Sequence, residues 1–190
     1  MMTKSHLQWG DREVVITGVG MVTPVGGSTM ETWRALLRGG NGIGPISRFD
    51  ASTFPVRFAA ECEDLEILDS KSMAQGDLTH MFRPFSEIGK KVSSNCQRIL
   101  QTRKGRLAFR AAQEAWVMAS IDKSTSEKWT SEGRLGVCLG SEAGRPSLPD
   151  VAKQMRKQLL PSVSELNVLA PRAPADLVAE MIGATGPVTV

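Results

Sequence analysis

Blocks of apolar residues, separated by polar and glycine-rich stretches, predict strands that alternate with helices along this chain. The uninterrupted run Val14-Val15-Ile16 predicts a strand over residues 13–18 that is buried on both faces, as in parallel sheets covered by helices. Residues 135–139 form a similar run, and a last strand is predicted after Gly186-Pro187. Residues 56–62 alternate imperfectly and predict a short strand. This order predicts an α/β fold with a predominantly parallel sheet between helical layers.

Two helices have the clearest signals. The first is expected to begin at Ser28, where Glu31 completes a capping box, and to end at the glycine pair that follows residue 38. The second covers residues 102–120, and its apolar stripe is mostly alanine, so that another backbone can come close. Each stripe includes a tryptophan, and we expect Trp33 and Trp116 to be core residues. The opposite, polar face of the second helix comprises Arg106, Arg110, Gln113 and Glu114.

The remaining segments are read from their caps and breakers. Residues 147–160 and 174–182 carry apolar stripes bounded by proline and glycine, and both predict helices. Residues 122–133 are polar and predict a connection without regular structure. Residues 63–97 are also polar and predict an excursion over the surface, with a short helix near residues 85–95.

A glycine turn follows the first predicted strand and admits two interpretations. Gly18 and Gly20 match the start of the G-x-G-x-x-G fingerprint of dinucleotide-binding proteins. The third glycine position is Thr23, and the helix starts later, near Ser28, rather than on the glycines. No acidic residue closes a second strand about twenty residues on, where a ribose would need it. These departures disfavour a nucleotide site.

The second interpretation is a family resemblance carried by two segments. Residues 14–26, VVITGVGMVTPVG, are similar to the opening strand and turn of the β-ketoacyl-acyl-carrier-protein synthases. Residues 41–57, NGIGPISRFDASTFPVR, are similar to the family's SGIGPITRFDASDFPVR run. The two segments occur in the family's order and spacing, which makes the match specific. The resemblance implies the α/β thiolase-like fold, with this chain as its N-terminal half.

The end of the sequence bears on catalysis. Residues 186–190, GPVTV, resemble the strand that the family places just before its nucleophilic cysteine, in the setting GP-x-x-TV-S-T-A-C. We therefore expect residues 1–12 to be a flexible terminus and residues 13–190 to be the synthase N-terminal domain, cut just before that cysteine. On this reading the chain contains no catalytic residue, and by itself it is expected to be inactive. The family's later histidines and lysine are not in this sequence.

The resemblance also implies a reaction and partners. Family members condense acyl thioesters with malonyl-acyl carrier protein in fatty-acid or polyketide synthesis, without a cofactor or metal, and form homodimers or heterodimers. The alternative is a non-catalytic relative, such as a chain-length-factor-like partner subunit or a degenerate paralogue. Residues 140–145, GSEAGR, replace a segment that usually reads G-T-G-x-G-G, which favours a divergent specificity. The acidic carrier protein is expected to dock on basic residues, with the candidates Arg103, Lys104, Arg156 and Lys157, although an ordinary solvated helix face is the favoured explanation of these charges.

Composition narrows the other function classes. The net charge of +3 is too small to indicate nucleic-acid binding, and no apolar run reaches the ~20 residues of a membrane span. The N-terminus has no apolar segment of a secretory signal, so a cytoplasmic location is expected. The spacing of Cys62, Cys96 and Cys138 fits no zinc pattern, and Cys138 is expected to be an inert thiol in a buried strand. His6 and His80 are expected to be lone surface histidines.

Overall fold

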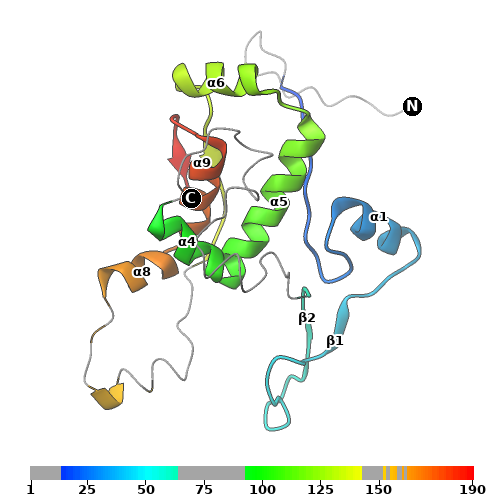
Figure 1. The fold of residues 1–190 in the computed structure, drawn as a ribbon. Helices are drawn as coiled ribbons and strands as arrows, with labels where there is room; N and C mark the ends of the chain where they lie inside the picture. The colour runs from blue at the N-terminus through cyan, green and yellow to red at the C-terminus, as the bar shows by residue number, and fades with distance from the viewer. Residues whose placement is uncertain (1–13, 64–92, 143–151, 153–154, 158–159, 161) are drawn as a thin grey trace, which may run out of the picture.

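The computed structural model describes residues 14–63, 93–142, 152, 155–157, 160 and 162–190. Helices and strands alternate along this part of the chain (Figure 1). The helices are α1 (Thr29–Leu37), α4 (Ser94–Gln101), α5 (Arg103–Ala119), α6 (Lys123–Ser131), α8 (Val163–Leu169) and α9 (Ala173–Ile182). The strands are β1 (Ile43–Pro45), β2 (Phe58–Ala60), β3 (Val137–Cys138) and β4 (Val188–Thr189).

Helices α4, α5 and α9 pack on one another and form the core. Helix α9 is buried along almost its whole length, because its residues are nearly all apolar. Phe109 of α5 is fully buried in the core cluster. Trp116, two turns further along the same face of α5, is 9% exposed. The prediction that Trp116 is a core residue is therefore confirmed. The fully buried core side chains also include Ile99, Leu100 and Leu177.

Strands β3 and β4 form a parallel pair against α9. Val137 lies opposite Val188, and Cys138 lies opposite Thr189. Side chains alternate along β3, so that Leu135, Val137 and Leu139 are half-buried against the core while the residues between them are exposed. The parallel pairing and both predicted strand positions are confirmed, but Cys138 is exposed, and its predicted burial is wrong.

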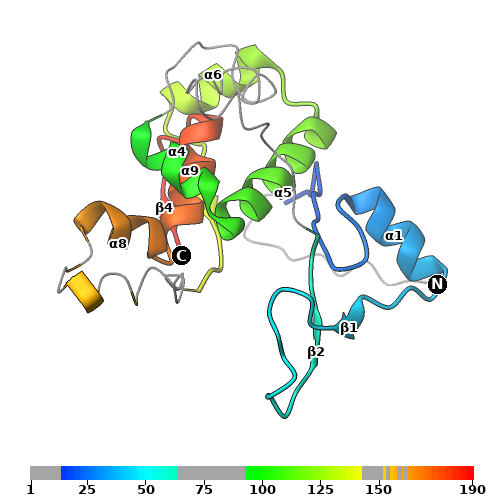
Figure 2. The same cartoon turned by 60° about the horizontal axis from the view of Figure 1, so that its bottom comes forward.

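Strands β1 and β2 form a separate antiparallel hairpin, in which Ile43 lies opposite Ala60. The hairpin extends away from the helical body, on the same side of α5 as α1 (Figures 1 and 2). At its tip the rings of Phe49 and Phe54 meet edge to face, with centroids 5.6 Å apart. Strand β2 confirms the short strand predicted within residues 56–62.

The helix ends follow the local signals in the sequence. Ser28 caps α1 by accepting a hydrogen bond from the backbone N–H of Glu31. Thr102 caps α5 in the same way. Pro174 lies in the first turn of α9, and Gly183 ends that helix with φ 66°, in the left-handed region that favours glycine. The predicted limits of these three helices are confirmed to within one or two residues.

Several predictions are corrected by the structure. Residues 14–18 form no strand, and Val14, Val15 and Ile16 are 73, 68 and 86% exposed. A strand needs a neighbour for its backbone hydrogen bonds, and no described strand pairs with this segment. Residues 122–133 contain helix α6, which Asp122 caps, so the prediction of a connection without regular structure is wrong. Trp33 is 57% exposed, so its predicted core position is wrong.

Two further helices were not predicted within their observed limits, and some predictions lie outside the described residues. Helix α4 begins at Ser94, next to the short helix expected near residues 85–95, and helix α8 was not expected at all. The flexible terminus, the 64–92 part of the excursion and most of the helix expected at 147–160 lie outside the described residues. None of the described helices combines the length and the apolar character that crossing a membrane requires.

Candidate functional site

The carboxyl edge of the β3–β4 pair is the candidate site. The N–H of Leu139 donates to the carbonyl of Thr189 across 3.1 Å, so the two strands end next to each other at this edge of the sheet. Residues 140–142 follow β3, and Val190 follows β4 at the same edge. Ligands of open α/β sheets bind beyond the carboxyl ends of the strands, where the following loops converge. The loop after β3 and the residues after β4 are therefore placed to line one site.

Close backbone contacts fix the register of this pair. The N–H of Gly186 donates to the carbonyl of Leu135 across 2.9 Å, and that of Val137 donates to the carbonyl of Pro187 across 2.9 Å. A Cβ atom at Gly186 would lie 2.7 Å from the carbonyl oxygen of Gly133. Only glycine fits there, so the glycine of the GPVTV segment sets how closely β4 approaches the chain leading into β3.

None of the three cysteines has the surroundings of a nucleophile. The Cys96 thiol donates to Glu180 across 3.0 Å, and burial together with this carboxylate raises the pKa of the thiol to about 12. A thiol with such a pKa stays protonated at neutral pH and is a poor nucleophile. Cys62 is half-buried, and Cys138 is exposed on β3. Cys138 lies within its strand rather than at the start of a helix, and Cys62 lies outside the described helices.

Lys104, a predicted docking residue, makes hydrogen bonds to backbone groups of this chain. Its Nζ donates to the carbonyl oxygens of Leu169 and Ala170, at 3.1 and 2.7 Å. These carbonyls end helix α8, so the ammonium group satisfies acceptors that lack an intrahelical partner. Burial lowers the pKa of Lys104 from its usual value. The contact joins the start of α5 to the end of α8.

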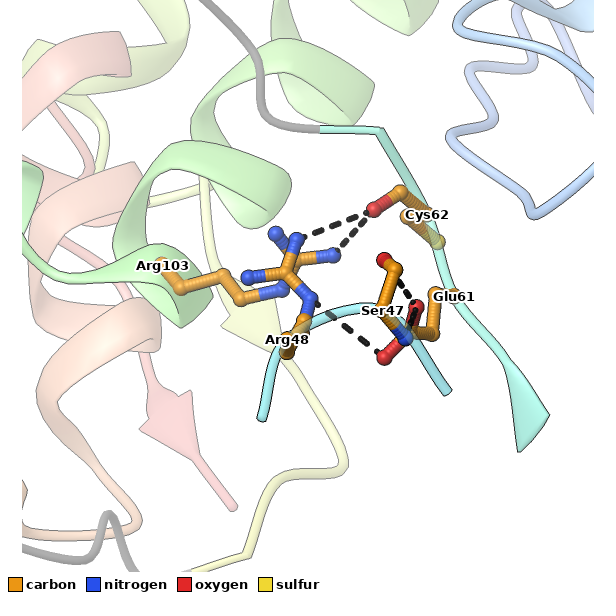
Figure 3. A network of polar contacts seen from close by, with 5 residues as sticks. All are labelled: Ser47, Arg48, Glu61, Cys62 and Arg103. Carbon is orange, nitrogen blue, oxygen red and sulfur yellow. Dashed lines mark hydrogen bonds and ion pairs between the residues drawn. The ribbon is translucent and has the colours of Figure 1, made fainter. Parts of the chain in front are cut away.

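Arg103 is also used inside the chain, in the network drawn in Figure 3. Its guanidinium and that of Arg48 both donate to the carbonyl oxygen of Cys62. Glu61 accepts from the backbone and the hydroxyl of Ser47, at 3.0 and 2.7 Å, and its other oxygen lies 3.9 Å from Arg48. Hydrogen bonds from Ser47 lower the pKa of Glu61. The network ties both strands of the β1–β2 hairpin to the first turn of α5.

The other two docking candidates have a different setting. Arg156 and Lys157 are exposed helical residues, and they lie much later in the sequence than the α5 pair. The four predicted residues therefore divide into two that hold backbone carbonyls and two that face solvent.

The glycine turn bounds a hollow of about 550 Å³. Within the turn, the hydroxyl groups of Thr23 and Thr32 lie 2.9 Å apart, and Thr32 is 4% exposed. Arg34 and Arg38 of α1 face the same hollow, together with the carboxylates of Glu31 and Glu63. The opposite charges balance, so the hollow carries no clear preference for an anion or a cation.

Glu114 was missed as a site residue. Its carboxylate accepts from the backbone N–H of Met21 and from both the backbone and the hydroxyl of Thr29. Burial alone would raise the pKa of Glu114, but these hydrogen bonds and the charge of Arg110 outweigh burial and lower it. Its polar neighbours on α5 suggested a solvent face, and no local signal reveals donors 85 and 93 residues away.

The described residues contain no group of three or more His, Cys, Asp or Glu side chains that could hold a metal ion. Among the described residues at the sheet edge, 139–142 and 189–190 include no cysteine or histidine. The ends of β3 and β4 can therefore position reacting groups that lie next to them.

Comparison with known proteins gives a consistent picture. A family model described as the N-terminal domain of beta-ketoacyl synthase matches residues 11–190. The 3-oxoacyl-[acyl-carrier-protein] synthase 2 of Staphylococcus aureus (strain COL) is 30% identical over 180 residues, which are 93% of this chain and 37% of that protein. The protein of the same name from Coxiella burnetii is 34% identical over 136 residues, 70% of this chain and 26% of that protein. The chain thus spans well under half the length of these relatives.

A solved structure, the ishigamide ketosynthase/chain length factor, superposes with a TM-score of 0.57 over 93% of this chain and 39% of its own. Its sequence identity is 18%, so this likeness concerns the fold alone.

Proposed function

This chain belongs to the family of the β-ketoacyl synthase N-terminal domain, and from that membership we propose that it supplies the N-terminal half of the active-site frame of a 3-oxoacyl-acyl-carrier-protein synthase. The family is one of acyltransferases, and the fold is the α/β thiolase-like fold. The observation that carries the proposal is the family match over residues 11–190, in which the parallel pair β3–β4 ends at one edge of the sheet.

The proposed reaction is the family's condensation. A cysteine thiolate attacks the carbonyl of an acyl thioester and releases the carrier thiol. A malonyl thioester then loses carbon dioxide, and the resulting carbanion attacks the acyl-cysteine. This step forms the carbon–carbon bond and releases the thiolate, while two histidines stabilise the oxyanion. In this scheme β4 leads toward the position of the nucleophile, and residues 140–142 form the adjacent wall of the active site.

Acyl carrier protein is the proposed partner, and Arg156 and Lys157 are its proposed docking residues. Both side chains are exposed, whereas Arg103 and Lys104 already hold carbonyl groups of this chain. Replacing Arg156 and Lys157 together by glutamate should slow association with an acidic carrier protein, more strongly at low salt. Replacing Lys104 by methionine should instead lower stability, because the end of α8 loses its donor. Surface plasmon resonance and thermal unfolding separate these two effects. Equal association rates for the double variant and the parent would remove this docking assignment.

A chimera tests the proposed activity. Residues 11–190 of this chain replace the matching segment of the Staphylococcus aureus 3-oxoacyl-[acyl-carrier-protein] synthase 2, which is 30% identical over 180 residues. We expect the chimera to form a 3-oxoacyl product from acyl- and malonyl-carrier protein. Mass spectrometry of the product measures this activity. The control replaces the nucleophilic cysteine of the chimera by alanine and should abolish product. A chimera that melts cooperatively as a dimer but makes no product would contradict the proposal.

A non-catalytic, chain-length-factor-like partner subunit is the second candidate. One observation favours it: Glu142 puts an exposed charge in the loop after β3, where the resembled family usually has small residues. A folded chimera that has no condensing activity by itself, but restores product when paired with a catalytic subunit that is inactive alone, would support this candidate. Cytoplasmic location and dimerisation belong to both proposals.

A further inference from the structure

The turn at residues 22–27 and helix α1 are held together by contacts within themselves. Thr23 and Gly26 exchange backbone hydrogen bonds of 2.9 and 3.2 Å. The hydroxyl groups of Thr23 and Thr32 lie 2.9 Å apart, and the N–H of Gly27 donates to the carboxylate of Glu31 across 2.9 Å. These bonds close the turn on the first two turns of α1. The hydroxyl of Thr29 also lies 3.3 Å from the carbonyl oxygen of Val19, so residues 19–38 are one internally bonded unit.

Apolar packing does not attach this unit to the core. Met30, Trp33 and Leu37 form the apolar stripe of α1, and all three are more than half exposed. Among the described residues, the core cluster includes no side chain of α1. The buried residue of α1 is Thr32, which faces its own turn. The views agree in placing α1 on the opposite side of α5 from α4 and α9 (Figures 1 and 2).

Three kinds of contact attach the unit to α5: the carboxylate of Glu114, two glycines, and a hydrogen bond of 3.3 Å from the N–H of Val19 to the sulfur of Met118. Both oxygens of Glu114 accept from the N–H of Thr29, at 2.8 and 3.0 Å, and one of them also accepts from the N–H of Met21 at 3.0 Å. The hydroxyl of Thr29 adds a fourth bond of 3.0 Å. Gly18 and Gly20 lie against the backbone of α5, where a Cβ atom would come within about 2.0 Å of a carbonyl oxygen. Glycine contacts bury little apolar area, so the carboxylate is the strong part of the link.

We infer that residues 19–38 open from α5 as one unit, and that the carboxylate of Glu114 holds this unit closed. The flanks allow such a motion. Residues 14–17 form no regular structure, and Gly39, just after α1, has φ 71°, a conformation that glycine enters and leaves without strain. Opening uncovers the alanine stripe of α5 at Ala111 and Ala115 and carries the wall of the hollow with it. This inference does not depend on the proposed function.

Hydrogen exchange on the 190-residue chain tests the inference. In the parent, the amides of Met21 and Thr29 should be protected by Glu114. In Glu114→Gln both should exchange faster by about tenfold or more, since one amide group cannot accept all four bonds and its NH₂ opposes a donor. The amides inside α1 that bond within the helix should keep their parent rates. Glu114→Asp keeps the charge on a shorter side chain and should give intermediate rates.

The matched control is Glu132→Gln, because Glu132 is an exposed carboxylate whose partner, Arg134, is two residues away. It should leave Met21 and Thr29 unchanged. Unchanged exchange at Met21 and Thr29 in Glu114→Gln would overturn the role of the carboxylate. Faster exchange throughout α1 would overturn opening as one unit, because the helix would then be unfolding rather than moving. Faster exchange in α9 as well would show global destabilisation and would also overturn it.

Discussion

At the scale of single residues, the two helical tryptophans differ sharply in environment. Trp116 is 9% exposed in the core, whereas Trp33 is 57% exposed on α1. Trp116→Ala should lower the free energy of unfolding by about 3–5 kcal/mol, because it leaves a large cavity in the core cluster. Trp33→Ala should cost less than about 1 kcal/mol, as surface substitutions usually do. Denaturant titration followed by circular dichroism measures both, and similar losses in the two variants would contradict the assigned burial.

Glu114 predicts an acid dependence. Its carboxyl pKa is lower in the folded chain than the ordinary value of 4.5, since Met21 and Thr29 donate to the charged form. A lowered folded pKa stabilises the chain above about pH 4.5, and this contribution is lost as the pH falls through the folded pKa. The stability difference between the parent and Glu114→Gln should therefore be constant near neutral pH and shrink below pH 4.5. Thermal unfolding from pH 7 to 3 measures it, and a difference that grows on acidification would contradict the sign.

At the scale of elements, the glycine turn on α5 gives a matched pair of substitutions. A Cβ atom at Gly20 would lie 1.9 Å from the carbonyl oxygen of Ala111, whereas one at Gly44 would meet nothing within 4 Å. Gly20→Ala should cost about 1–3 kcal/mol, because the turn must move away from the helix backbone. Gly44→Ala should be close to neutral. Melting temperatures compare them, and a Gly20→Ala protein as stable as Gly44→Ala would mean that the turn does not rest on α5.

Elements with local signals could be predicted, and those with distant partners could not. Ser28, Thr102 and Gly183 specify helix ends through bonds to residues within a few positions, so α1, α5 and α9 follow from the sequence. Strand formation at Val14–Ile16 depends on a neighbouring strand, and the apolar run carries no information about that neighbour. Trp33 and Trp116 look alike in the sequence because both lie on apolar helical stripes. Only tertiary contacts decide which of the two stripes is covered.

The same reasoning applies to the candidate site. The sheet edge after β3 and β4 could be located from the glycines and the apolar runs that surround it. The internal hydrogen-bond partners of the basic pair of α5 could not be predicted in the same way. Arg103 and Lys104 carry charges that fit a docking face, but their acceptors are the carbonyls of Cys62, Leu169 and Ala170, which lie 41, 65 and 66 residues away in the sequence. Only the fold brings such acceptors within reach.

At the scale of the whole molecule, apolar side chains on separate segments remain uncovered. Val14, Val15 and Ile16 are more than two-thirds exposed, as is Leu37 on α1. The parallel pair β3–β4 has two strands, and parallel sheets are usually larger and covered on both faces. Exposed apolar patches and open strand edges both favour association between chains.

We therefore predict that the 190-residue polypeptide, produced by itself, is marginally stable and self-associates. Sedimentation velocity should show oligomers that grow with concentration, because each exposed large apolar side chain gains about 1.5–3 kcal/mol when buried. The double variant Trp33→Gln/Leu37→Gln should shift the distribution toward smaller species, since it removes two large exposed apolar groups of α1. Val163→Gln, on α8, is the matched control for a single exposed apolar residue and should change the distribution less. A monodisperse monomer with one cooperative melting transition would contradict the prediction and would show that these apolar faces do not drive association.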